Sequence, residues 1–108
     1  MSGETDPRLL LLAPEDNVLI STAPLAEGER LAVEGELIVL AGRIRLGHKI
    51  ARRDLAAGEK VLKYGAPIGS MTEPARRGAH VHVRNLKSDY IPTYVIENQA
   101  DFEKRRIP

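Results

Sequence analysis

Short apolar runs recur along the chain and are separated by turns rich in glycine and proline. Runs of this length between turn residues are typical of β-strands. We therefore predict strands near residues 8–12, 17–21, 36–41, 48–51, 60–64 and 80–84. Prolines interrupt any continuous helix through the middle of the chain, at Pro14, Pro24, Pro67 and Pro74. Only the polar stretch 97–106 has the composition of a helical turn.

One local pattern repeats: an apolar or small residue, two spacers, a glycine, two further residues and an apolar residue. It occurs at residues 25–31, 44–50 and 55–61, and in a weaker form at 75–81. Glycine adopts positive φ without steric cost, so each copy predicts a tight turn that leads into a strand. The copies start 11 to 20 residues apart, a spacing too irregular for a solenoid. The pattern predicts a mainly β single domain of short strands.

The composition narrows the possible chemistry and location. The chain has 108 residues with three tyrosines, one phenylalanine and no tryptophan, so aliphatic residues must supply its core. It has no cysteine, which excludes disulfides, thiolate metal sites and cysteine nucleophiles and agrees with a cytoplasmic location. No apolar run approaches the roughly 20 residues of a membrane span. The start of the chain lacks the basic region of a signal peptide.

Charge is unevenly distributed although the net charge is only +1. Residues 1–36 hold eight acidic and two basic residues, whereas residues 37–91 hold eleven basic and four acidic residues. A basic middle favours an anionic partner; the alternative is that surface strands simply carry lysine and arginine. A nucleic acid is disfavoured, because aromatic residues for base stacking are few and no nucleic acid-binding motif is present.

The stretch GAHVHVRN holds two of the chain's three histidines. In an extended strand His80, His82 and Arg84 share one face. Val81 and Val83 then share the other face, where they can enter the core. Two neutral imidazoles spaced in this way can ligate one divalent metal with a third ligand from elsewhere, or act as an acid–base pair near neutral pH. The alternative is an exposed sheet face that carries polar residues.

Two other segments carry candidate chemistry. His48 follows a turn glycine in GHK, and in an extended segment Lys49 faces away from it. In KYG, Lys63 can bind an anionic oxygen or, when desolvated, act as a base, and Tyr64 can donate a hydrogen bond to developing negative charge. The alternative for each segment is a purely structural role, and PIG at 67–69 has the composition of a turn. Phosphate-loop, dinucleotide, HExxH and GxSxG motifs are absent, and the carboxylates form no evident catalytic pair.

Taken together, residues 46–85 resemble the SAF-type domain of the altronate/galactarate dehydratase family, and equally the small subunit of sulfolactate sulfo-lyase. The family pattern is GHKxA, an acidic–apolar–x–x–Gly turn, VxKYGxxIG and GxHVHxHN. This chain carries it at Gly47, His48, Lys49, Asp54, Leu55, Gly58, Lys63, Tyr64, Gly65, Ile68, Gly69, Gly78, His80, Val81, His82 and Asn85. One position departs: the third histidine of HVHxH is Arg84, which either removes a metal ligand or adds a carboxylate clamp.

The resemblance implies a β-clip fold of short bent strands over residues 1–91, followed by an extension, 92–108, that contacts a partner or caps the core. It also implies elimination chemistry on an acidic sugar or a related hydroxy acid, in which a proton next to a carboxylate is removed and water or sulfite leaves. The family is associated with a divalent metal, usually iron, which we expect to be held with or by a large subunit.

Because the chain ends at Pro108 without the large domain of the family enzymes, we expect the small subunit of a two-component hydro-lyase. His48, His80 and His82 are then the candidate catalytic residues, and His80 and His82 the candidate metal ligands. The candidate substrate-binding residues are Lys49, Lys63, Tyr64, Arg84 and Asn85. Three alternatives remain: a non-catalytic SAF module that docks a large subunit or binds an acidic ligand, a sulfo-lyase small subunit acting on sulfolactate, and an independent enzyme with its site between copies of the chain.

Overall fold

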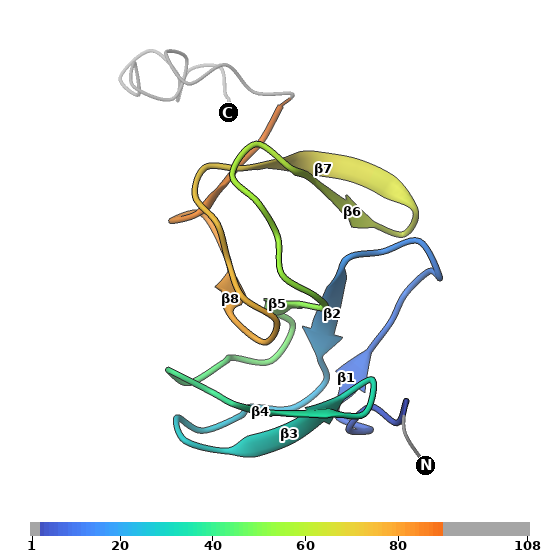
Figure 1. Ribbon diagram of the computed structural model, residues 1–108, viewed down its shortest axis with the longest axis vertical. Helices are drawn as coiled ribbons and strands as arrows, with labels where there is room; N and C mark the ends of the chain where they lie inside the picture. Colours follow the sequence, from blue (N-terminus) through green and yellow to red (C-terminus); the bar gives the residue numbers. More distant parts are fainter. Residues whose placement is uncertain (1–2, 90–108) are drawn as a thin grey trace, which may run out of the picture.

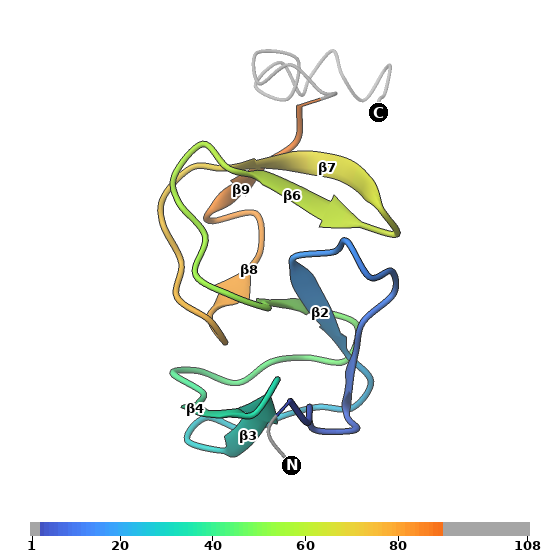
Figure 2. The ribbon, with the colours of Figure 1, turned by 45° about the vertical axis from the view of Figure 1, so that its right-hand side comes forward.

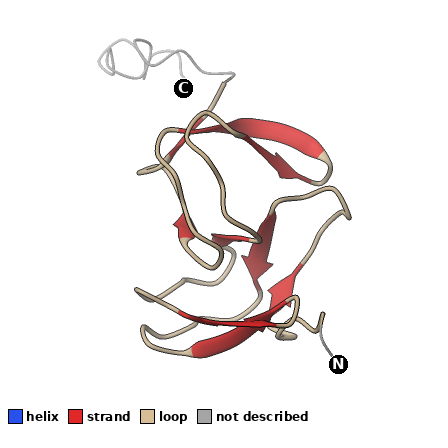
Figure 3. Cartoon of the chain, viewed as in Figure 1, coloured by secondary structure: helices blue, strands red, loops and turns tan. Residues whose placement is uncertain are grey.

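The computed structural model describes residues 3–89, and every regular element in that range is a strand (Figures 1 and 3). The strands are β1 Leu9–Leu10, β2 Val18–Ser21, β3 Arg30–Val33, β4 Glu36–Val39, β5 Lys49–Ala51, β6 Lys60–Lys63, β7 Ala66–Met71, β8 His80–Val81 and β9 Leu86–Lys87. The prediction of a mainly β domain of short strands is confirmed. The described range contains no helix that could cross a membrane. The predicted helical turn at 97–106 and the extension 92–108 lie outside the described residues.

The strands form three antiparallel sheets. The central sheet has the order β1-β2-β5-β8, and the other two are β3-β4 and β6-β7-β9. The two hairpins β3–β4 and β6–β7 lie at opposite ends of the molecule, with the central sheet between them (Figure 1).

The repeated glycine pattern corresponds to a repeated structural unit. Its four turn glycines have φ between 84° and 90°, and they are Gly28, Gly47, Gly58 and Gly78. Each turn leads into a strand, as predicted. The copies also pair with each other, because Leu25 bridges to Ile44 and Leu55 bridges to Ala75. The chain is therefore built as two consecutive halves, each with a hairpin enclosed by two glycine turns.

Both hairpins were predicted only in part, since the predicted strand ranges omit β3 and β7, and only the Gly28 turn indicated a strand at β3. The hairpins turn at Glu34–Gly35 and Tyr64–Gly65, where all four residues have positive φ. Asparagine, aspartate and glycine are typical of such turns, and Glu34 and Tyr64 are not, so the sequence did not indicate these two turns. The interpretation of 67–69 as a turn is wrong, because these residues lie inside β7. A bulge in the β6–β7 pairing lets a strand include a proline there.

The central sheet separates two hydrophobic cores. Val18 and Ala51 face one core, whereas their neighbours Leu19 and Ile50 face the other. The first core contains Leu9, Leu19, Leu25, Leu31, Val33, Ile38, Leu40, Ile44 and Ile50. The second contains Val18, Ala51, Leu55, Val61, Met71, Ala75 and Val81. Within residues 3–89 both cores are built from aliphatic side chains and one methionine, and each half of the chain supplies most of one core.

The second hairpin gains a third strand that the first one lacks. β9 lies along β7, with Met71 paired to Leu86, and Leu86 and Ile68 pack against the second core (Figure 2). No strand of residues 3–89 lies along the outer edge of β4, and Leu37 and Val39 remain 62% and 61% exposed. β9 therefore anchors the segment that follows β8 back onto a sheet.

Two polar residues fasten the second hairpin to β2. The buried carboxylate of Asp16 accepts hydrogen bonds from the N–H groups of Tyr64 and Gly65, at 2.9 and 2.7 Å. The amide of Asn17 donates to the carbonyl of Lys60 and accepts from the N–H of Leu62. The Asp16 bonds satisfy backbone groups of the tight turn, and the Asn17 bonds satisfy groups of β6 at its bulge.

Alanine is expected to cost more at Gly78 than at Gly58, although both have positive φ. At Gly58 an added Cβ meets no atom within 4 Å, so we expect only the backbone strain of about 1 kcal/mol. At Gly78 the Cβ would stand 2.4 Å from Cδ1 of Ile38, which adds about 1 to 3 kcal/mol of overpacking. Urea unfolding followed by circular dichroism measures both variants, and equal losses of stability would contradict the close contact.

Candidate metal centre

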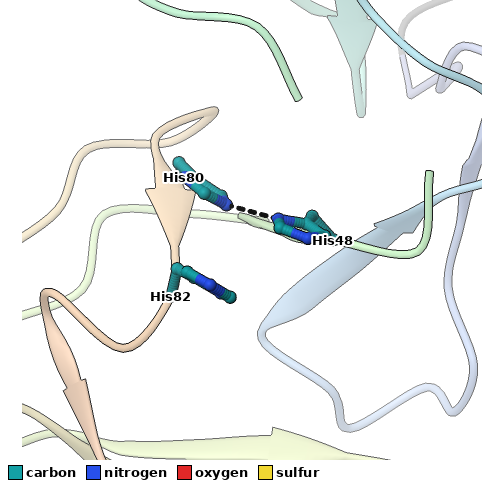
Figure 4. A group of neighbouring side chains, drawn as sticks. All are labelled: His48, His80 and His82. Atoms are coloured by element: carbon teal, nitrogen blue, oxygen red, sulfur yellow. Dashed lines mark hydrogen bonds between the residues drawn. The ribbon is translucent and has the colours of Figure 1, made fainter. Parts of the chain in front are cut away.

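The three histidines of the chain meet beside the central sheet (Figure 4). His48 lies in the glycine turn before β5, His80 begins β8, and His82 directly follows it. The β5–β8 pairing places Ile50 opposite His80, and this brings the turn next to β8. Nδ1 of His48 lies 3.0 Å from Nε2 of His80, and one nitrogen from each ring lies within 4.8 Å of the others. The predicted pair of imidazoles thus gains a third.

The three rings are stacked. Their centroids lie 4.6 to 5.2 Å apart, and their planes are inclined by 11° to 21°. Like charges at this separation repel, so the arrangement favours the uncharged forms of His80 and His82.

The surroundings of the cluster also disfavour protonation. Burial lowers the pKa of His80, and the positive charges of the other two histidines, Arg84 and Lys49 lower it further. The pKa of His82 is lowered by the same kinds of contribution, with desolvation the largest. Burial lowers the pKa of the half-buried Lys49 as well, with a smaller contribution from Lys63. Neutral imidazoles with free lone pairs are the form that binds metals.

In the metal-free protein we expect His80 and His82 to titrate below the ordinary histidine value of 6.5. At these two histidines the unfolded chain then binds more protons than the folded chain. The free energy of unfolding therefore falls as the pH drops below about 6.5. NMR titration of the ring protons gives the two pKa values, and urea unfolding at about pH 7.5 and about pH 5 gives the stability.

Arg84→Gln serves as the matched variant, because it removes one positive charge that both histidines sense. It should raise both pKa values. Values at or above the ordinary one in the unmodified chain would contradict the effect of the surroundings.

The strand that was predicted for residues 80–84 is shorter. β8 ends at Val81, and residues 83–85 form a turn. Val81 is buried as predicted, but Val83 is 80% exposed, so its predicted entry into the core is wrong. Arg84 consequently lies in the turn and does not continue the histidine face of a strand.

Asn85 is the physical reason for this turn. Its side-chain amide donates to the carbonyl of His80, and its side-chain oxygen accepts from the N–H of His82, each at 2.9 Å. The N–H groups of Asn85 and Leu86 both donate to the carbonyl of His82. Both polar groups of the side chain are therefore engaged in holding the backbone of two histidines in place.

The remaining predicted residues lie at different distances from the cluster. Lys63 is close enough to Lys49 to affect its pKa. Tyr64 lies at the tip of the β6–β7 hairpin with 71% of its surface exposed, and its ring does not stack on His48, His80 or His82. The structure thus brings Lys49 and Arg84 near the imidazoles but not the ring of Tyr64.

A hollow of about 430 Å³ opens beside His80. Arg43, Arg84 and Asn85 also line it, and none of its lining residues within 3–89 is acidic. An adjoining hollow of about 620 Å³ shares Arg84 and Asn85 and continues past Arg76. Arg43 was not among the predicted site residues, and the basic middle of the chain was its only signal in the sequence.

Residues 7–89 match the family model of the altronate/galactarate dehydratase SAF domain. The chain belongs to this family. The resemblance found over residues 46–85 is therefore confirmed, and the SAF domain extends over nearly all the described residues.

Curated relatives contain this SAF domain in different settings. The altronate dehydratase of Escherichia coli (strain K12) is 36% identical over 88 residues, which are 82% of this chain but 18% of that protein. The altronate dehydratase of Bacillus subtilis (strain 168) is 37% identical over 75 residues, 69% of this chain and 15% of that protein. The (2R)-sulfolactate sulfo-lyase subunit alpha of Paracoccus pantotrophus is 47% identical over 45 residues, 42% of this chain and 67% of that protein. The chain thus spans less than a fifth of the length of these altronate dehydratases.

Proposed function

We propose that this SAF domain acts as the small subunit of a two-component lyase that eliminates water from an acidic sugar or a related hydroxy acid. The observation that carries the proposal is the convergence of His48, His80 and His82, with their ligating nitrogens within 4.8 Å of one another. This convergence occurs in a chain whose relatives include altronate dehydratases.

The same histidines are proposed to hold a divalent cation such as iron. Two imidazole nitrogens bound to one cation at about 2.0 to 2.1 Å stand about 3 Å apart. The separation of 3.0 Å between the nitrogens of His48 and His80 fits this requirement. Imidazole suits iron, zinc and related ions, and three protein ligands leave room for a substrate oxygen. When bound, such a cation polarises the substrate's oxygen atoms as a Lewis acid.

The residues of this chain then bind and orient the substrate. Lys49 and Arg84, which both affect the pKa of His80, supply positive charge for the anionic groups of the substrate, and Lys49 receives its first carboxylate. Asn85 fixes the backbone positions of His80 and His82 through the two hydrogen bonds of its side chain. No carboxylate among residues 3–89 influences the pKa of His80 or His82. We therefore assign the base that removes the proton next to the substrate carboxylate to a large partner chain.

The relatives support a partner of this kind. The sulfo-lyase relatives are named as alpha subunits, and the altronate dehydratases carry most of their length outside the matched segment. In this proposal the SAF domain supplies the histidines and the positively charged side chains of a site that the partner completes.

A sulfo-lyase is the second candidate, and one observation favours it. The sulfo-lyase subunit alpha of Chromohalobacter salexigens is 51% identical over 45 residues, a higher identity than the altronate dehydratases reach over their longer matches. In this candidate the same half-site acts on sulfolactate, and sulfite leaves in place of water.

Reconstitution tests the proposal. The purified chain is mixed with the large lyase chain of its own genome, with ferrous iron, and assayed on hexonates, hexarates and sulfolactate. We expect no activity from the chain alone and activity from the mixture. Activity of the chain alone would favour an independent enzyme. An inactive mixture in which the two chains bind each other would favour a docking module, and release of sulfite would favour the sulfo-lyase.

A further inference from the structure

The hollow beside His80 carries more positive charge than one carboxylate requires. Arg43 lines it from the segment between β4 and β5, and Arg84 from the turn between β8 and β9. These segments belong to different halves of the chain, and the fold brings the two arginines to the wall of one hollow of about 430 Å³.

Neither guanidinium is engaged by the part of the chain that the structure describes. Within residues 3–89, no ion pair and no side-chain hydrogen bond involves Arg43 or Arg84. The ion-paired cations are Arg8, Arg52, Arg53, Lys60 and Arg77. Arg77 is an instructive contrast, because it lines the adjoining hollow but its donors are taken by Glu34 and Glu36. The donors of Arg43 and Arg84 are therefore available to a ligand.

The rest of the wall allows close approach. Ala41, Gly42, Gly78 and Ala79 line the hollow with minimal side chains. A Cβ added at Gly42 would meet no atom within 4 Å, so the space next to Arg43 is open.

We infer that Arg43 and Arg84 form a second anion-binding position, and that the ligand is a hydroxy acid with an anionic group at each end. This inference rests on the proposed function, in which the histidine cluster and Lys49 receive the first carboxylate. A guanidinium binds a carboxylate or a sulfonate through parallel hydrogen bonds, so both kinds of terminal group fit. A monoacid would leave the two guanidinium groups without an anionic partner.

Galactarate and galactonate test the inference, because they differ only in whether the second terminus is a carboxylate or an alcohol. Their affinities for the full-length chain loaded with zinc, which is redox-inert, are measured by ¹H–¹⁵N NMR titration. We expect galactarate to bind about three- to tenfold more tightly, the range for one charge-assisted contact near solvent.

Arg43→Gln should bring the ratio of the two affinities close to one while the affinity for galactonate stays unchanged. Arg45→Gln is the matched control, because Arg45 is an exposed arginine of the same segment and is not among the residues that line the hollow beside His80. It should retain the preference. Both positions are exposed, and the NMR spectra themselves verify that the variants are folded.

Equal affinities for the two acids, an unchanged preference in Arg43→Gln, or no detectable binding of either acid would each overturn the inference. A zinc titration of the same samples separates it from the proposed function. Zinc binding without a diacid preference defeats the second anion position alone. A diacid preference that Arg43→Gln removes, without zinc binding, supports the arginines and defeats the metal centre.

Discussion

Alanine in place of His80 is expected to lower the affinity of the chain for divalent metal by about 100-fold or more. This exceeds the loss that follows when a residue that hydrogen-bonds to a metal ligand is removed. His48→Ala and His82→Ala should have effects of similar size, because each removes one of the three converging nitrogens. The result for His48 is the most informative, since a site built on His80 and His82 alone would not need it.

Competition of zinc between the protein and a chromophoric chelator measures these affinities. Val83→Ala is the matched control, because this residue follows His82 directly but is 80% exposed. Its metal affinity should equal that of the unmodified chain. Histidine variants that bind zinc as well as the control does would exclude the cluster as a metal centre.

Asp16→Ala is expected to cause the largest loss of stability. The Asp16 carboxylate is only 1% exposed and accepts the N–H groups of Tyr64 and Gly65. Removing it leaves both donors without their acceptor, at a total cost of about 2 to 4 kcal/mol. For a domain of this size that corresponds to a decrease in Tm of roughly 10 to 20 °C.

Two further variants calibrate this result. Asp16→Asn keeps one acceptor oxygen but turns an NH₂ group toward the other donor, so its loss should be smaller than that of alanine. Glu73→Ala removes an exposed carboxylate and should stay within about 0.5 kcal/mol of the unmodified chain. Unfolding in urea, followed by circular dichroism, gives all three values. A loss in Asp16→Ala no larger than that in Glu73→Ala would show that the turn is held by other contacts.

Much of the fold was predictable because its main signals are local. A tight turn with positive φ favours glycine wherever it occurs. The strands were therefore predictable from the glycines of the turns before them, Gly28, Gly47, Gly58 and Gly78. The two hairpin turns were hidden, because Glu34 and Tyr64 adopt positive φ without being residues that signal it. Their conformation is stabilised by distant groups, such as Asp16, and a local pattern does not contain that information.

The site was predictable to a similar extent. The alternation at His80 and His82 indicated paired imidazoles, but their contact with His48 depends on the pairing of β5 with β8, more than thirty residues apart in the chain. The predicted alignment of Arg84 with the histidines is wrong. The Asn85 side chain hydrogen-bonds to backbone groups of His80 and His82, and this ends the strand and forms a turn. The importance of Arg43 depends on the hollow that it lines, which exists only in the folded domain.

The two cores on opposite faces of one central sheet have a consequence for folding. β2 and β5 each contribute residues to both cores. Unfolding of either half would therefore expose core residues of the other half to water. We therefore expect the two similar halves to unfold in a single cooperative transition, with neither half folded by itself. His48 precedes β5 and His80 begins β8, so the cluster assembles only when both halves are in place. Metal bound there would stabilise the domain as a whole, and its release would report on global unfolding.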